Sequence, residues 1–295
     1  MIYHYTTIEA FYNILAIYKS SGEKGYLEFW ASSILNQNDK EELSVTVEKL
    51  LPVVKKIERD IKINVSDLKK LSTVDELNWL PTLTGRKIKE SIKDYFQDEC
   101  NIPYTMSFCQ HEDELLMWSM YANNGNGLCI AFDENVLFEK QKHSFVFPNE
   151  VIYDNNPQKC KEIIRLFYDY YLKEIEKESV INIIYNMKRN YWERMLMGIS
   201  PFMKNKAFKD EAEYRFVYYI TGDTPVYTRL SRHMNMIKYI KVKVPLAALK
   251  HIVIGPCANY RKTKSLLVEN MKSCNIEREY DKRFIRKSRV PYRIF

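Results

Sequence analysis

Residues 123–132 read NNGNGLCIAF, a polar turn that runs directly into an uninterrupted apolar stretch. Asn and Gly tolerate the positive φ angles of tight turns. A short apolar run bounded by such a turn is typical of a strand buried on both faces. The stretch therefore predicts a buried strand over residues 128–132.

Other strands and helices are expected on both sides of this strand, and they follow no strict strand–helix alternation. We expect strands at 2–5, 26–32, 104–109, 214–220, 239–244, 251–254 and 276–280, and helices at 8–18, 112–120 and 259–273. This order favours the α+β class with a mixed, mainly antiparallel central sheet. Helical periodicity predicts large helical insertions at about 41–99 and 157–197 within a single domain spanning 1–295.

Composition excludes several classes of protein. The 295 residues include only 8 glycines, and neither G-x-x-x-x-G-K-[ST] nor G-x-G-x-x-G occurs, so the P-loop and Rossmann folds lose their main support. The six cysteines form no C-x-x-C, and the five histidines form no H-E-x-x-H, so we expect no metal site and a reducing compartment. Without a signal peptide or a long apolar run, we expect a cytoplasmic protein with no membrane contact.

The excess positive charge is concentrated near the carboxyl end. The chain carries a net charge of +7, and residues 257–295 alone hold eleven Lys or Arg against four Asp or Glu. Such a segment can meet phosphate or nucleic acid. A solvated surface that keeps the protein in solution explains it as well.

Several short motifs occur in a recognisable order along the whole chain. They are YHYT (3–6), FWAS (29–32), NQNDKEE (36–42), SFC (107–109), Trp118 with Tyr121, GLCIAF (127–132), FKDEAEYR (208–215), IGP (254–256) and VPYR (290–293). Together they resemble the domain of unknown function 2971, a bacterial family that includes abortive-infection proteins of phage defence. NQNDKEE departs from the family pattern Asn-Asp-x-x-Glu, which leaves open whether Asn36 or Asn38 corresponds.

The beginning of the chain also resembles ADP-ribosyltransferase-like folds, in which an early strand carries His or Arg and a late strand carries a Glu. The resemblance implies NAD as substrate. Cleaving the bond between nicotinamide and ribose needs a carboxylate that stabilises an oxocarbenium-like transition state. Glu213 is the candidate, with Glu211 beside it, and the two share a face if the segment is extended. A surface pair of acids flanking Lys209 and Arg215 explains the same residues.

The NAD hypothesis also gives roles to residues of the first strand. His4 is a third catalytic candidate; strand alternation places it with Thr6 on one face, and Tyr3 and Tyr5 on the other. A structural histidine at a strand end explains His4 equally.

The remaining residues of the hypothesis are assigned to binding the dinucleotide. Aromatic rings would stack on nicotinamide or adenine, polar side chains would line the cleft, and an arginine would meet the diphosphate. These dinucleotide-binding candidates are Tyr3, Tyr5, Thr6, Trp30, Asn38, Asp39, Tyr121 and Arg215. Trp118 is expected in the core, and an N-cap explains Asp39.

Three functional hypotheses follow. The first is an NAD-dependent ADP-ribosyltransferase or NAD glycohydrolase, an effector in phage defence, whose cleft joins His4, Trp30 and Glu213. The second is a nucleic-acid-binding protein or nuclease that uses residues 257–295, because basic grooves with aromatic side chains hold single strands. The third is a non-enzymatic sensor or partner-binding module in which Glu213 and Arg215 form a structural pair.

Overall fold

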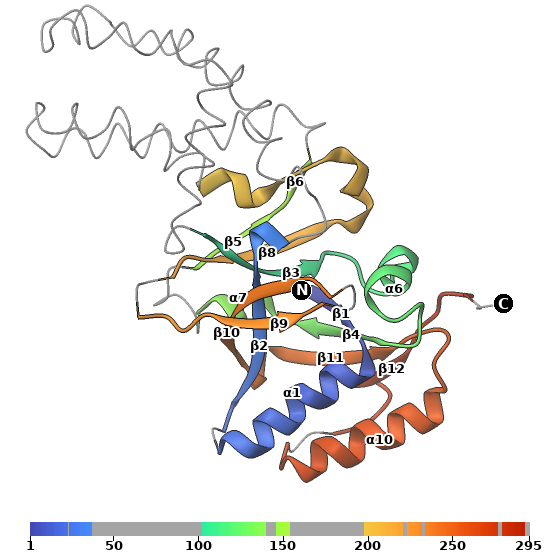
Figure 1. Ribbon diagram of the computed structural model, residues 1–295. Helices are drawn as coiled ribbons and strands as arrows, with labels where there is room; N and C mark the ends of the chain where they lie inside the picture. The colour runs from blue at the N-terminus through green and yellow to red at the C-terminus, as the bar shows by residue number, and fades with distance from the viewer. Residues whose placement is uncertain are drawn as a thin grey trace, which may run out of the picture. The chain divides into compact units, whose positions relative to one another are not determined.

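The computed structural model describes residues 1–22, 24–36, 102–139, 146–153, 198–220, 223–231, 234–276 and 279–292 (Figure 1). The helical insertions expected at 41–99 and 157–197 lie outside these residues. The chain forms two compact units, of which the larger comprises Met1–Asn36, Pro103–Glu150 and Asp210–Phe295. The smaller unit comprises Gln37–Ile102 and Val151–Lys209.

The larger unit is built on one mainly antiparallel sheet of ten strands, which confirms the expected α+β class. The strands are β1 (Ile2–Thr6), β2 (Tyr26–Ser33), β3 (Tyr104–Cys109), β4 (Leu128–Phe132), β5 (Val146–Glu150), β8 (Glu213–Tyr218), β9 (Tyr227–Leu230), β10 (Met236–Pro245), β11 (Leu249–Ile254) and β12 (Ile285–Lys287). Their main order is β12-β11-β4-β1-β3-β2-β10-β9, and β8 pairs with both β3 and β5. Only β11 and β12 run parallel among these pairs. The last strand of the described residues, β12, lies later in the chain than the strand expected at 276–280.

Two long helices cover the same side of this sheet, as Figure 1 shows for α1 (Ile8–Ser21) and α10 (Tyr260–Ser273). Helix α1 begins because the Thr7 hydroxyl caps the Ala10 amide at 3.0 Å, and it ends at Gly22, whose φ of 67° suits glycine. Phe11 and Leu15 lie on its buried face. Burying each such side chain contributes roughly 1.5–3 kcal/mol.

The side of the sheet under α1 and α10 forms the main hydrophobic core, and we call it the core face. Alternate residues of the strands point into it, among them Ile2, Phe29, Phe108, Phe132 and Ile252. The other face carries the intervening residues, and we call it the polar face. There the short helix α6 (Leu115–Tyr121) covers the centre of the sheet, with Trp118 fully buried against Tyr5.

Two loops approach each other closely where β4 begins and β11 ends. The Gly255 amide donates to the Gly127 carbonyl at 3.0 Å. A Cβ atom at Gly127 would lie 2.3 Å from the Thr6 carbonyl oxygen, and one at Gly255 would lie 2.3 Å from the Gly125 carbonyl oxygen. Only glycine leaves room for these contacts.

The described part of the smaller unit is short. It contains β6 (Ile152–Tyr153) and β7 (Met203–Lys204), which pair in parallel. A 3-10 turn over Ser200–Phe202 leads into β7. The ammonium group of Lys204 lies 4.8 Å from the centre of the Phe208 ring.

Candidate functional site

A row of side chains crosses five neighbouring strands on the polar face. The register pairs Tyr3 with Cys109 on one side and with Ala131 on the other. Cys109 in turn pairs with Glu213, and Ala131 pairs with His251. Because residues directly opposite each other point to the same face, all five share the polar face. At about 4.8 Å between strands, the row spans roughly 19 Å.

His4 lies on the core face instead. Its ring makes edge contacts with Phe29 and Phe108, at centroid distances of 5.5 and 5.8 Å, and Nδ1 lies 3.2 Å from the Ser107 carbonyl oxygen. Burial lowers the pKa of His4, and the bond to Ser107 only partly opposes that shift. The expected cleft joining His4 to Glu213 is therefore wrong, because strand alternation places these side chains on opposite faces.

The same alternation was correctly expected within β1. His4 contacts core-face rings, whereas the Tyr5 ring packs at 5.0 Å against Trp118 on the polar face. Thr6, expected beside His4 in a cleft, is buried. Trp118 is fully buried, as expected for a core residue.

The predicted carboxylates lie in a buried polar cluster. Arg215 is fully buried and donates from Nε and Nη2 to both carboxylate oxygens of Glu213, at 2.7 and 2.9 Å. Glu211 is only 2% exposed and accepts a 2.7 Å hydrogen bond from the Tyr121 hydroxyl. The segment is not extended between the acids, because Ala212 has a φ of 42°. The ion pair between Arg215 and Glu213 that the third hypothesis expects is therefore present.

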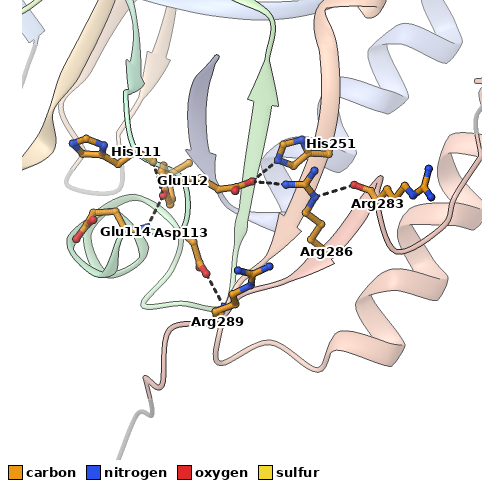
Figure 2. Close-up of polar contacts among 9 residues, drawn as sticks. His111, Glu112, Asp113, Glu114, His251, Arg283, Arg286 and Arg289 are labelled. Atoms are coloured by element: carbon orange, nitrogen blue, oxygen red, sulfur yellow. Dashed lines mark hydrogen bonds and ion pairs between the residues drawn. The ribbon is translucent and has the colours of Figure 1, made fainter.

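An accessible acid lies at the other end of the row (Figure 2). One carboxylate oxygen of Glu112, Oε1, contacts His251 Nε2 and lies 3.2 Å from Arg286 Nη1. The Glu112 and Arg286 side chains are 32% and 42% exposed, so solutes can reach both. Arg286 is held further by a 2.9 Å hydrogen bond from Nε to the Arg283 carbonyl.

The protonation state of His251 follows from these contacts. Burial lowers its pKa, and the Arg286 charge adds to the shift, while the Glu112 contact opposes it. The ring is therefore neutral at pH 7, and since Nε2 faces a carboxylate, Nε2 carries the proton. Nδ1 is left as the basic nitrogen, and it has no hydrogen-bond partner among the described residues.

Tyr3 adjoins this acid. It is partly exposed, and its pKa is raised first by burial and then by the charge of Glu112, with Arg286 acting in the opposite direction. We call the four residues Tyr3, Glu112, His251 and Arg286 the histidine–acid cluster. Of its members, only Tyr3 was singled out from the sequence as a site residue.

The loop that presents Glu112 is fixed by Asp113, whose φ is 61°. Asp113 Oδ1 accepts from Trp118 Nε1 at 2.8 Å and from the Ser288 hydroxyl at 2.5 Å, and Oδ2 accepts from the Arg289 amide at 2.6 Å. Figure 2 shows the contact to Arg289 next to the Glu112 contacts. Asp113 thus joins helix α6 to the chain that follows β12.

Tyr5 serves the same loop from β1. Its hydroxyl accepts from the Glu114 amide at 2.8 Å and lies 3.1 Å from the His111 carbonyl, to which it donates. Burial raises the pKa of Tyr5 far above its ordinary value. These contacts give Tyr5 a positioning role, since its hydroxyl is fully engaged by the backbone.

The other predicted binding residues are dispersed. Trp30 lies on β2, 42% exposed, and stacks on Tyr239 of β10. Tyr121 is engaged by Glu211, as described above. Asn38 and Asp39 lie outside the described residues.

Sequence reasoning missed His251, Glu112 and Arg286 as a group. The available signal was one histidine opening the apolar strand HIVI (251–254) and an acidic run, HEDE (111–114). His251 and Glu112 are 139 residues apart in the chain, so no local pattern joins them.

Two kinds of feature are absent from the described residues. In that part of the chain, no three His, Cys, Asp or Glu side chains gather closely enough to hold a metal ion. No helix there has the length and apolar character that crossing a membrane requires.

Comparisons with known proteins cover one stretch of the chain. No curated protein and no solved structure gives a significant match. The stretch that does match contains most of helix α6, strand β4 and the acidic pair before Tyr214, but neither β1 nor His251. Residues 117–216 match the family model described as a protein of unknown function (DUF2971), which supports the family resemblance drawn from the motifs.

Proposed function

We propose that this chain is an enzyme that cleaves NAD between nicotinamide and ribose, as an ADP-ribosyltransferase or an NAD glycohydrolase. We place its site at the histidine–acid cluster instead of at His4 and Glu213. One observation carries this choice: Glu112 is a carboxylate that a ligand can reach, at 32% side-chain exposure, and it is oriented by an imidazole and a guanidinium. Glu211 and Glu213, at 2% and 5% exposure, are enclosed by protein.

The chemistry of each side chain suits this reaction. Departure of nicotinamide leaves positive charge on the ribose, which a fixed carboxylate stabilises. His251 and Arg286 hold Glu112 through Oε1, so the second carboxylate oxygen, Oε2, can face a substrate. Arg286 Nη2 has no acceptor among the described residues and suits a diphosphate oxygen.

Tyr3 and His251 complete the proposed site. Tyr3 lies close enough to Glu112 for the carboxylate charge to raise its pKa, and its ring supplies an aromatic surface for a base. The neutral His251 offers Nδ1 as a general base that activates an acceptor hydroxyl or water. Transfer and hydrolysis differ only in which of these acceptors is bound.

The ADP-ribosyltransferase-like character of the fold and a role in bacterial phage defence belong to the same proposal. The mainly antiparallel sheet and the family match over residues 117–216 are compatible with both. Since fold-level likeness alone does not define a function, the test has to be chemical.

The decisive measurement is nicotinamide release from NAD by the purified chain, with and without a cell extract as the source of acceptors. We expect release that Glu112→Gln lowers by about 100-fold or more, in line with the loss of one transition-state carboxylate. Glu9→Gln is the matched control, because Glu9 is an exposed acid in the first turn of α1. Circular dichroism should show that both variants are folded.

Two results would count against the proposal. An absence of both nicotinamide release and NAD binding would end it and favour a partner-binding module. Release that survives Glu112→Gln would retain the reaction but remove Glu112 from the site.

A further inference from the structure

Three aromatic rings form a column on the polar face of the β2–β10–β9 part of the sheet. The Tyr227 and Tyr239 rings stack at a centroid distance of 5.6 Å, and Tyr239 stacks on Trp30 at 4.5 Å, each pair tilted by 27°. Tyr239 is buried in the middle, whereas Tyr227 and Trp30 are 37% and 42% exposed. We call these three rings the aromatic column.

The register explains why the rings meet. Tyr227 is directly opposite Tyr239, and Trp30 is opposite Lys241, two residues further along β10 on the same face. The residues between them, such as Phe29, Ala31 and Ile240, point into the core. The column therefore lies on the outer side of β2 and β10, whose other side packs into the core, while β9 is mostly exposed.

One end of the column is occupied and the other is accessible. The Lys241 ammonium group lies 4.8 Å from the Tyr227 ring centre and 3.3 Å from Glu28 Oε1. Trp30 Nε1 donates to the same Glu28 oxygen at 3.2 Å, which fixes the indole. Since one face of the indole lies against Tyr239, its exposed area is the far face and the edge, where another flat ring can continue the stack.

Cationic side chains border the column. Arg229 lies two residues beyond Tyr227 on the same face, and among the described residues it makes only a 3.5 Å hydrogen bond from Nη2 to Ser32. Its remaining donors have no acceptor in that part of the chain. Lys241 is exposed on β10, so among the described residues Arg229 and Lys241 lie beside one acid, Glu28.

We propose that the aromatic column is a binding surface for single-stranded nucleic acid: a base stacks on Trp30, and Arg229 and Lys241 contact backbone phosphates. Stacked aromatics beside cations are the combination that binds single strands without sequence preference. A protein partner fits less well, because Lys and Glu are depleted in protein–protein interfaces, and both border the exposed rings here. This surface differs from the basic segment 257–295 and does not depend on the proposed NAD chemistry.

The test is fluorescence anisotropy of a labelled oligouridine of about twelve nucleotides with the full chain at low salt. Trp30→Ala should weaken binding by roughly tenfold, the loss of one stacked base. Trp30→Phe should retain most of the affinity of the unmodified chain. Arg229→Met should lower the slope of log affinity against log salt by about 0.7, the share of one phosphate on a single strand. Leu230→Ala is the matched control, since Leu230 is exposed on the other face of the same hairpin.

Several outcomes would overturn the assignment. They are an absence of binding at low salt, an affinity that Trp30→Ala does not change, and equal affinity for a mononucleotide. Self-association that Trp30→Ala abolishes would assign the surface to a second copy of the chain. Nicotinamide release measured on Arg229→Met separates the two proposals, because it should equal that of the unmodified chain.

Discussion

Arg215 and Glu213 form a doubly hydrogen-bonded ion pair within one strand, with nitrogen–oxygen distances of 2.7 and 2.9 Å and an arginine that is fully buried. Two residues apart on β8, they point to the same face. A buried charge is tolerated when its partner is present and becomes costly when the partner is removed. The pair is therefore a sensitive point for stability.

Glu213→Gln should destabilise the protein by about 3–5 kcal/mol, because it removes the carboxylate that accepts two hydrogen bonds from the buried Arg215. Urea unfolding followed by circular dichroism measures the change. The double variant Glu213→Gln/Arg215→Met should recover part of the loss, since the buried Arg215 charge is then removed together with that of Glu213. A cost below about 0.5 kcal/mol for the single variant, the level of ordinary surface substitutions, would contradict a structural role for the pair.

Acid should weaken the fold through its buried histidines. The pKa values of His4 and His251 are both lowered from 6.5, chiefly by burial. Below pH 6.5 the unfolded chain therefore binds more protons than the folded one, so the free energy of unfolding falls as pH decreases through this range. One group contributes at most about 1.4 kcal/mol per pH unit.

His4→Gln tests this linkage, because glutamine does not titrate and its amide can donate to the Ser107 carbonyl. Unfolding free energies measured between pH 7 and pH 5 should fall less steeply in the variant, while the remaining slope includes the contribution of His251. An unchanged slope would mean that His4 does not resist protonation in the folded protein.

The sequence was sufficient where a local pattern decides the structure. The apolar run over 128–132 predicted β4, and alternation correctly separated His4 from Tyr3 and Tyr5. It was insufficient where pairing between distant strands decides. Nothing local indicates that Cys109 pairs with both Tyr3 and Glu213, and this register is what puts Glu213 on the face opposite to His4.

The candidate site illustrates the same limit. Glu112 and Arg286 are 174 residues apart in the sequence, and each alone resembles an ordinary surface charge. Asp113 explains why the loop takes its position, but its three acceptor contacts depend on Trp118, Ser288 and Arg289 already being in place. Only the tertiary structure brings these groups together.

Gly127→Ala should be among the most destabilising single substitutions in the larger unit. Its Cβ would lie 2.3 Å from the Thr6 carbonyl oxygen and 2.8 Å from Ala122, both backbone contacts that cannot move independently. We expect a loss of at least about 3 kcal/mol, the upper range for forced overpacking, measured by thermal unfolding. Gly22→Ala is the control: it has the same chemistry at a φ of 67° but nothing within 4 Å, and should cost about 1 kcal/mol.

Cys109 and Cys129 should resist alkylation in the folded protein. Both thiols are fully buried on the polar face under the loop that carries Glu112. Burial raises the pKa of Cys109 to about 11, against the opposing hydrogen bond from the His111 amide, and it also raises the pKa of Cys129. Since the thiolate is the reactive species, iodoacetamide at pH 8 should label neither until urea unfolds the chain, as peptide mass spectrometry can determine site by site. Cys257 provides the internal comparison, because it is partly exposed and its Sγ lies 3.6 Å from the Tyr292 carbonyl oxygen. It should be labelled before Cys109 and Cys129. Early labelling of Cys109 would show that the 110–114 loop opens in the native state, and Glu112 would then lack the fixed orientation that NAD cleavage requires.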